Sequence, residues 1–374
     1  MLQSLIKELE SEKEQKTIGS GWISGVFALL FALLSLLSVF ILHYPDILTT
    51  QPIRQAIDPT LFRSLVYAFI ITGFLLASIS LILRQNKIFG MSAMILIFVS
   101  IILGGSAAQA SMTSTNMSIG LDWLLINLLL TGLIFLPIER LFRRIEQSVF
   151  RFEWKDDLLY FAVGSLFVQT LTFLSMYPTQ SILSSFDLSA LHQTISSQPL
   201  VLQLIEVMFL TDFVQYWLHR ALHKVPFLWK FHAVHHSTKA MDWLAASRMH
   251  FLEIIVLRAL TVIPMYVLGF DASAIYIYII IVYLYSTYIH ANVRFDIEFL
   301  KPFIVTPRFH HWHHGIEKEA IDVNFAIHFP IFDRLFGSYH MPKGRWPEGY
   351  GIKGDMPKGY LKQFVYPFSK SKKR

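Results

Sequence analysis

Long uninterrupted runs of apolar residues alternate with short polar segments along most of the chain. A bilayer core about 30 Å thick is crossed by roughly 20 apolar residues in a helix, so runs of this length predict membrane-spanning helices. The first run has no small-residue cleavage pattern after it, and we expect a retained span rather than a signal peptide. The expected spans lie near residues 21–43, 63–84, 88–108, 119–138, 158–178, 199–218, 254–270 and 272–291.

The last two runs are separated only by a short turn, and Arg258 and Pro264 interrupt the first of them. They are therefore compatible with two spans or with a re-entrant pair. Ahead of the first span, the opening 22 residues carry mixed charge and predict a short amphipathic cytoplasmic helix.

Lysine and arginine positions test this map independently. Clusters of them follow the second, fourth and sixth spans, and the tail is also basic. The loops near residues 105–118, 178–198 and 269–272 contain neither residue type. Because basic residues concentrate in cytoplasmic loops, both termini are expected to be cytoplasmic.

Composition agrees with a membrane protein. Of the 374 residues 54% are hydrophobic and 16% are charged, whereas soluble domains usually carry about 25% charged residues. The absence of cysteine excludes disulfides, thiolate metal sites and a cysteine nucleophile. We attribute the net charge of +6 to membrane topology and anionic headgroups, and expect no nucleic-acid partner.

Histidine is concentrated in the second half of the chain, where 13 of the 15 residues lie between His219 and His340. Residues three or four apart on a helix share a face, with Cβ atoms about 5–6 Å apart, so such a cluster can direct several imidazoles at one ion or at two neighbouring ions. Three clusters have this spacing: His219 and His223; His232, His235 and His236; His310, His313 and His314.

The expected topology brings the three clusters to one side of the membrane. The first closes the sixth span, the second follows nine residues later, and the third lies just beyond the eighth span. His290, at the cytoplasmic end of the eighth span, is placed to join them. Nine imidazoles are too many for one ion and suit two. Imidazole favours Zn, Cu, Fe or Ni, so the ligand type alone does not choose the metal.

Acidic residues near these clusters are candidates for catalytic or orienting groups. Asp212 lies two helical turns before His219 within a span, where an acid is a functional candidate, although a hydrogen bond between helices is the alternative. Asp333 could support the third cluster or cap a local helix. His250 and Glu253, three residues apart, could form a pair that orients a metal ligand.

The order of residues around the clusters is specific. It runs Asp212-x3-Tyr216-x2-His219-Arg220-x2-His223, then Leu228-Trp229-x2-His232-x2-His235-His236-Ser237, then Thr306-Pro307-x2-His310-x2-His313-His314, Asn324-Phe325 and Phe332-Asp333-Arg334-Leu335-Phe336-Gly337. Over about residues 205–340 this order resembles the fatty acid hydroxylase/sterol desaturase superfamily. Ala326 and Ser338 depart from the glycine and threonine usual there, and neither is a ligand position.

The resemblance implies a di-iron centre, with two Fe ions held by the nine histidines, that uses O2 to oxidise C–H bonds of a lipid, by hydroxylation or desaturation of a fatty acyl, sterol or related substrate. An external electron donor of the cytochrome b5, ferredoxin or reductase type is expected, since no haem, flavin or nicotinamide motif occurs. Zinc could replace iron in purified protein, because zinc binds such sites more tightly than ferrous iron.

Two other classes of protein fit parts of the pattern. A membrane zinc-dependent hydrolase acting on a lipid would need a general base such as Glu253 or Glu317, but catalytic zinc usually takes three protein ligands. A metal transporter would carry its histidines within the spans rather than on one side of them.

The expected fold is all-α, a polytopic helical membrane protein with a cytoplasmic histidine-rich dimetal domain. Residues 1–150 would form about four spans without an assigned role, residues 151–342 the catalytic domain, and residues 343–374 a basic cytoplasmic tail.

Overall fold

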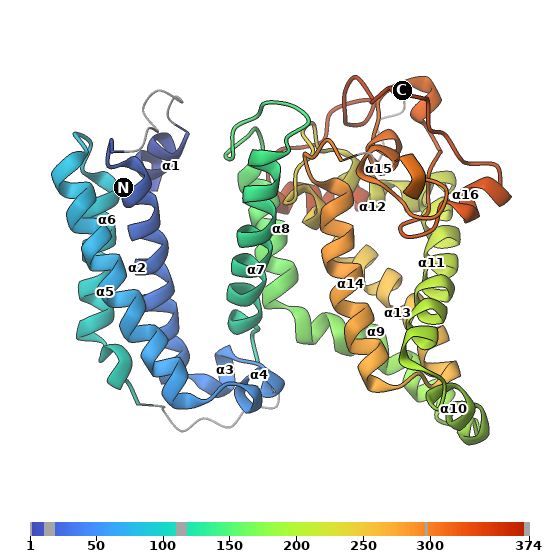
Figure 1. Ribbon diagram of the computed structural model, residues 1–374, viewed down its shortest axis with the longest axis horizontal. Helices are drawn as coiled ribbons and strands as arrows, with labels where there is room; N and C mark the ends of the chain where they lie inside the picture. The colour runs from blue at the N-terminus through green and yellow to red at the C-terminus, as the bar shows by residue number, and fades with distance from the viewer. Residues whose placement is uncertain (1, 11–18, 110–117, 296–297, 370–374) are drawn as a thin grey trace. The chain divides into compact units, whose positions relative to one another are not determined.

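The computed structural model describes residues 2–10, 19–109, 118–295 and 298–369. Across these residues the chain is helical, with isolated β-bridges and no β-strand, which confirms the all-α expectation (Figure 1). The chain divides into two compact units, Met1–Ile126 and Asn127–Arg374. The division falls inside the long helix α7 (Leu121–Leu141), and the expected domain limits at 150 and 342 stay predictions.

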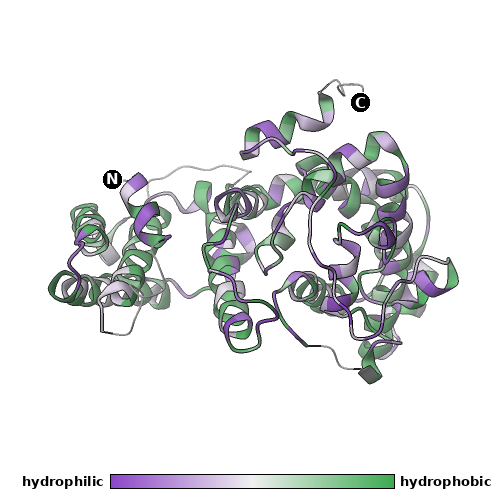
Figure 2. Cartoon of the chain, turned by 90° about the horizontal axis from the view of Figure 1, so that it is seen from above, coloured by the Kyte–Doolittle hydropathy of each residue, from purple (hydrophilic) through white to green (hydrophobic). Residues whose placement is uncertain are grey.

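The chain is a multi-pass membrane protein. Among the described residues, 7 helices are long and apolar enough to cross a membrane, and one bent pair would add another span. Figure 2 shows hydrophobic residues along these helices. The fifth expected span differs from the prediction, because α8 (Trp154–Leu166) and α9 (Val168–Leu183) meet at a 60° bend. Part of the expected amphipathic N-terminal helix, residues 11–18, lies outside the described residues.

The first unit is built around three long helices that approach one another closely. A Cβ atom at Gly25 would lie 2.6 Å from the Ser80 hydroxyl oxygen, and alanines fill the buried contacts beside it. Small residues allow such close packing within a membrane. The elements are α1 (Leu2–Leu9), α2 (Trp22–His43), α3 (Pro45–Leu48), α4 (Gln51–Ala56), α5 (Pro59–Leu83), α6 (Ile88–Ile102), the 3-10 turn η2 (Gly105–Ala107) and the start of α7.

The second unit contains every histidine of the three clusters. After α7, α8 and α9 its elements are α10 (Ser189–Ser196), α11 (Leu200–Lys224), α12 (Pro226–His236), η3 (Ala245–Ser247), α13 (Phe251–Leu268), α14 (Ala272–His290), η4 (Glu298–Leu300), α15 (Pro307–His313), η5 (Lys318–Ala320), α16 (Ile331–Leu335), α17 (Tyr360–Val365) and η6 (Tyr366–Phe368).

Local sequence explains where the histidine-bearing helices begin. Val225 is extended and Pro226 occupies the first turn of α12, so the chain leaves α11 and starts a new helix within two residues. Thr306 caps α15 by accepting a hydrogen bond from the Phe309 N–H, and Pro307 follows it. As Figure 1 shows, α12 and α15 consequently lie at the ends of α11 and α14 that are opposite to α10.

A buried core of aromatic and aliphatic residues supports this end of the unit. Tyr216 of α11, Ile289 of α14, Phe309 of α15 and Phe325 of the following segment pack together. The Tyr216 hydroxyl lies 2.8 Å from the Ser338 hydroxyl, which ties α11 to the segment after α16. The core therefore joins α11, α14 and α15, which carry metal-ligand candidates, to the segment that follows α15.

Candidate metal centre

Nine histidine side chains converge at this end of the unit and form two adjacent groups. In each group one ring nitrogen from every residue lies within 4.8 Å of the others, as a shared metal ion requires. Group 1 contains His219, His223, His232, His236 and His313, and group 2 contains His235, His290, His310 and His314. These are the nine histidines that the sequence indicates.

Helix α12 contributes to both groups, which is why the groups are adjacent. His232 and His236 are four residues apart and face group 1, whereas His235, offset by one position, faces group 2. The rings of His236 and His314 stack with centroids 4.3 Å apart, so the two groups are in direct contact.

Several of the rings donate a hydrogen bond away from the groups. Carbonyl and carboxylate oxygens only accept, so the Nδ1 atom carries the proton in a neutral ring and the Nε2 lone pair faces inward. The acceptors are the carbonyl of Phe325 for His219 (2.7 Å), Glu253 for His232 (2.6 Å), the carbonyl of Arg248 for His235 (3.0 Å), the carbonyl of Ser286 for His290 (2.7 Å) and the carbonyl of Val323 for His313 (2.8 Å).

This arrangement leaves a pair of facing lone pairs in each group. The Nε2 atoms of His219 and His232 lie 3.0 Å apart in group 1, and those of His235 and His290 lie 3.2 Å apart in group 2. Protonation would relieve the repulsion, but burial lowers the pKa of His232 to about 3 and the pKa of His235 well below its usual range. A cation in each group removes the conflict, so the residues present fit one metal ion per group.

Asp212 and Asp333 both hold the segment that follows α15. Asp212 accepts the backbone N–H groups of Ile327 and Phe329 at 2.9 and 2.8 Å, and that of His328 at 3.2 Å. Asp333 accepts the N–H groups of Phe325 and Ala326 and the Ser338 hydroxyl, at 2.7, 2.9 and 2.7 Å. Because the Phe325 carbonyl orients His219, this segment is the link between the two carboxylates and group 1.

Buried ion pairs support group 2. The Arg248 guanidinium binds Asp157, and it also binds Glu153 at 3.0 Å. Asp157 in turn binds Arg151 at 2.6 Å, and Arg151 binds Asp242 at the same distance. Since the Arg248 carbonyl accepts from His235, the ion pairs fix the backbone that orients a group 2 ring. Sequence reasoning missed them, because their members are scattered single charges.

The remaining histidines of the second half lie outside the two groups. The ring nitrogens of His311 contact the Tyr350 hydroxyl at 2.7 Å and the Ala291 carbonyl at 3.2 Å. His250 caps α13 and also contacts the Phe364 carbonyl at 2.9 Å. Within the described part of the chain, neither ring nitrogen of His328 has a hydrogen-bond partner, and the Nε2 atom of His340 has none.

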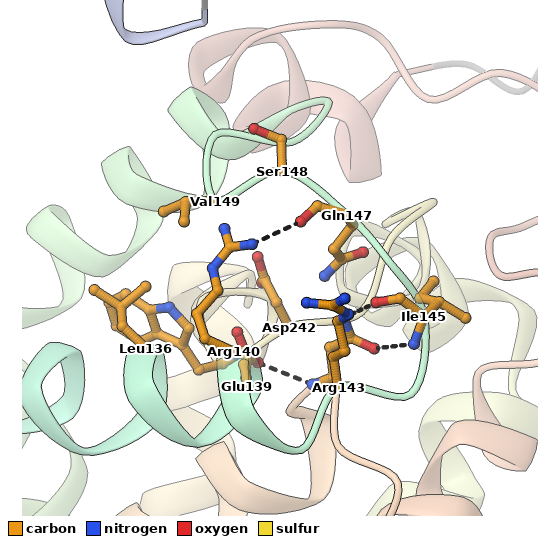
Figure 3. A pocket seen from close by; sticks show the side chains of 11 residues that line it. Leu136, Glu139, Arg140, Arg143, Ile145, Gln147, Ser148, Val149 and Asp242 are labelled. Atoms are coloured by element: carbon orange, nitrogen blue, oxygen red, sulfur yellow. Dashed lines mark hydrogen bonds between the residues drawn. The ribbon is translucent and has the colours of Figure 1, made fainter. Parts of the chain in front are cut away.

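A small pocket is lined by residues from the end of α7 and the segment after it, together with Asp242, Trp243 and Asn292 (Figure 3). Glu139 accepts the backbone N–H groups of Trp243 and Asn292 there, at 2.7 and 2.8 Å. Asn292 is two residues beyond His290, so Glu139 ties α7 to the end of α14. The side chains of Arg140 and Arg143 also line the pocket.

Comparison of the sequence with known proteins assigns the chain to a family. The sequence model of the fatty acid hydroxylase family matches residues 204–338. The chain is 30% identical over 207 residues to a candidate methylsterol monooxygenase of Dictyostelium discoideum, covering 54% of this chain and 75% of that protein. The chain belongs to the fatty acid hydroxylase family.

The names of two further relatives refer to different lipid substrates. The chain is 31% identical over 172 residues to the ornithine lipid hydroxylase OlsE of Rhizobium tropici, covering 46% of this chain and 52% of that one. It is 31% identical over 128 residues to the human alkylglycerol monooxygenase, covering 34% and 28% of the two chains. The chain thus spans about half the length of the first of these relatives. No solved structure matches it.

The family match and the structural site coincide. All nine histidines, together with Asp212 and Asp333, lie within the residues matched by the fatty acid hydroxylase model. The first unit, up to Ile126, lies outside them. The family resemblance therefore concerns the metal centre and its supporting helices.

Proposed function

We propose that this chain is a membrane-bound di-iron oxygenase that hydroxylates or desaturates a lipid with O2. The observation that carries the proposal is the pair of adjacent histidine groups, each of which holds facing Nε2 lone pairs at 3.0 to 3.2 Å. The relatives named hydroxylase and monooxygenase support it. The five histidines of group 1 would hold one Fe ion and the four of group 2 the other. Bound iron would supply the activation of O2.

The overall reaction fixes which partners are needed. In hydroxylation one oxygen atom of O2 enters a C–H bond and the other leaves as water, with two electrons and two protons supplied from outside. In desaturation two hydrogen atoms leave adjacent carbons and both oxygen atoms leave as water, with the same external supply. The donor would be of the cytochrome b5, ferredoxin or reductase type.

A lipid substrate fits the location of the site. The histidine groups lie where α11 and α14 end, so a substrate held among the spanning helices can present a carbon atom to them. We assign the site and both termini to the cytoplasmic side, because lysine and arginine concentrate in the loops on that side.

The chain's own residues orient the ligands and exclude water. Glu253 and four backbone carbonyls orient five of the nine rings, and the buried ligand set keeps bulk water from the reacting atoms. Asp212 and Asp333, which the sequence indicates as catalytic candidates, would act as positioning residues through the segment that they bind.

The proposal is tested by metal content and lipid profiling together. Protein produced with iron should contain two Fe ions per chain, and cells expressing it should accumulate a lipid that has gained one oxygen atom or lost two hydrogen atoms. His235→Ala should abolish that product. A chain that needs one zinc ion and hydrolyses a lipid without O2 would overturn the proposal in favour of a hydrolase.

A further inference from the structure

His328 is a buried histidine that belongs to neither metal group. It is 1% exposed, and neither its Nδ1 nor its Nε2 atom has a hydrogen-bond partner among the described residues. Nearly all buried polar side-chain atoms in proteins are paired, and an unpaired one costs roughly 1–3 kcal/mol. An imidazole left in this state is accordingly expected to meet a partner from outside the chain.

The ring lies against aromatic residues on the membrane-spanning helix α14. Its centroid is 5.3 Å from that of Tyr285 and 6.1 Å from that of Tyr278, and Phe329 packs beside it. The Tyr285 hydroxyl is already used, because it donates to the Val305 carbonyl. The two ring nitrogens of His328 are thus available for hydrogen bonds, and the side chains packed around the ring are aromatic.

The backbone holds this ring firmly in place. Asp212 accepts the N–H groups of His328 and of the residues on either side of it, and the Val305 N–H donates to the His328 carbonyl at 2.9 Å. The fully buried Asp212 carboxylate therefore fixes the backbone of the segment that carries His328. The same carboxylate thus holds both the segment behind group 1 and the backbone of His328.

Position along α14 relates His328 to the metal groups. Tyr285 and Tyr278 precede His290 by 5 and 12 residues, which corresponds to about 8 and 18 Å along a helix axis. His328 contacts both tyrosines, so it lies on the membrane side of group 2. A lipid chain that enters from the bilayer and reaches the metal groups has to extend over this range of depth.

The chemistry of the ring defines the kind of partner. Burial lowers the pKa of His328 to about 4, so the ring is neutral at physiological pH. The Ile327 backbone is near enough to oppose this shift slightly, but it does not form a hydrogen bond of normal geometry with either ring nitrogen. A neutral imidazole offers one N–H donor and one acceptor nitrogen. A hydroxyl or an N–H amide can pair with both nitrogens and an ester can accept from the N–H, whereas a charged group would be costly to bury there.

We propose that His328 contacts the lipid substrate and hydrogen-bonds an uncharged polar group on it, a hydroxyl, ester or amide. This inference rests on the proposed lipid oxygenase function. His328 would set which carbon atom reaches the metal groups, because it holds a second point of the same molecule at a fixed distance from them.

The test compares His328→Phe, which keeps an aromatic ring, with His328→Asn, which keeps a donor and an acceptor. His340→Phe is the matched control, since His340 also has an unpartnered ring nitrogen in the described residues but packs on Trp312. Each full-length variant is purified with iron, and its metal content, the host lipids it retains and its product profile are measured by mass spectrometry.

We expect His328→Phe to keep two metal ions per chain but to retain at least fivefold less lipid and to yield at least tenfold less product, or product altered at a different carbon. His328→Asn should recover part of both losses, and His340→Phe should match the unsubstituted protein. Unchanged lipid retention and an unchanged product in His328→Phe would overturn the inference. Failure of the proposed function is a separate result: the unsubstituted protein would then make no oxidised lipid, and retention alone would decide the role of His328.

Discussion

The Oε1 atom of Glu253 lies 2.6 Å from the Nδ1 atom of His232. This contact is shorter than a second one between a carboxylate and a histidine of group 1, in which Asp322 lies 3.5 Å from the Nδ1 atom of His223. Glu253 and His232 are both buried, so solvent does not weaken the contact between them. A carboxylate in this position fixes the tautomer of a ligating imidazole and increases its basicity. Glu253 therefore orients group 1 from the first turn of α13.

Replacing this carboxylate should weaken metal binding in group 1. We expect Glu253→Gln to reduce metal affinity or lipid turnover about 10–100-fold, since an amide is a weaker acceptor than a carboxylate. Metal content after dialysis against a chelator measures the effect. Glu319→Gln, at an exposed position, is the control and should behave like the unsubstituted protein. Equal metal retention and turnover in Glu253→Gln would show that the contact is structural only.

The two groups should lose metal separately. His219→Ala removes one of the facing nitrogens of group 1, and His235→Ala removes one from group 2. We expect each variant to fall from about two metal ions per chain towards one and to lose lipid oxidation, because both groups are needed. Elemental analysis beside His340→Ala tests this. A loss of both ions from either single variant would mean that the groups bind metal as one unit.

The ion pairs behind group 2 should be important for stability. Asp157→Asn removes a fully buried charge that binds both Arg151 and Arg248. Breaking a buried pair usually costs about 3–5 kcal/mol, because a charge is left uncompensated. Thermal unfolding in detergent should show a clear decrease in melting temperature, with Asp355→Asn, at an exposed position, as the control. A melting temperature equal to that of the control would contradict this role.

His328 should make stability depend on pH. Its pKa is about 4 in the folded chain and about 6.5 in an unfolded chain. Between these values the unfolded chain binds more protons, so the free energy of unfolding falls as the pH decreases from 6.5 to 4. At pH 5 the loss is about 2 kcal/mol.

His328→Phe removes this contribution, so the comparison isolates one residue from the other histidines. The variant should lose less stability than the unsubstituted protein between pH 7 and pH 5, as measured by thermal unfolding of both at each pH. Parallel losses in the two proteins would show that the His328 ring is not the group that takes up the proton.

The spans could be predicted because their length and apolar character are local properties. The expected limits of the first span, 21–43, agree closely with α2, which begins at Trp22 and ends at His43. The break between α8 and α9 was not expected, because the run of apolar residues continues through Phe167, where the bend occurs. A hydropathy pattern shows that a segment is apolar. It does not indicate whether the helix bends within that segment.

The ligand candidates could be predicted for the same reason, since spacings of three and four residues already place rings on one helix face. The acceptors that orient the rings could not. The carbonyls of Phe325, Arg248, Ser286 and Val323 are backbone atoms that every residue has, so no side-chain pattern indicates them. Asp212 shares the face of His219, as expected, yet its carboxylate binds backbone N–H groups on another segment.

The sequence by itself determined the membrane class of the protein, its helical fold and the nine histidines, because these follow from local composition and helical periodicity. Tertiary structure alone decided how the nine divide into five and four, which carboxylate meets His232, and why His328 lies unpaired beside α14. The physical reason is that these features depend on contacts between residues as far apart as Asp212 and Ile327, and only packing of the helices brings them together.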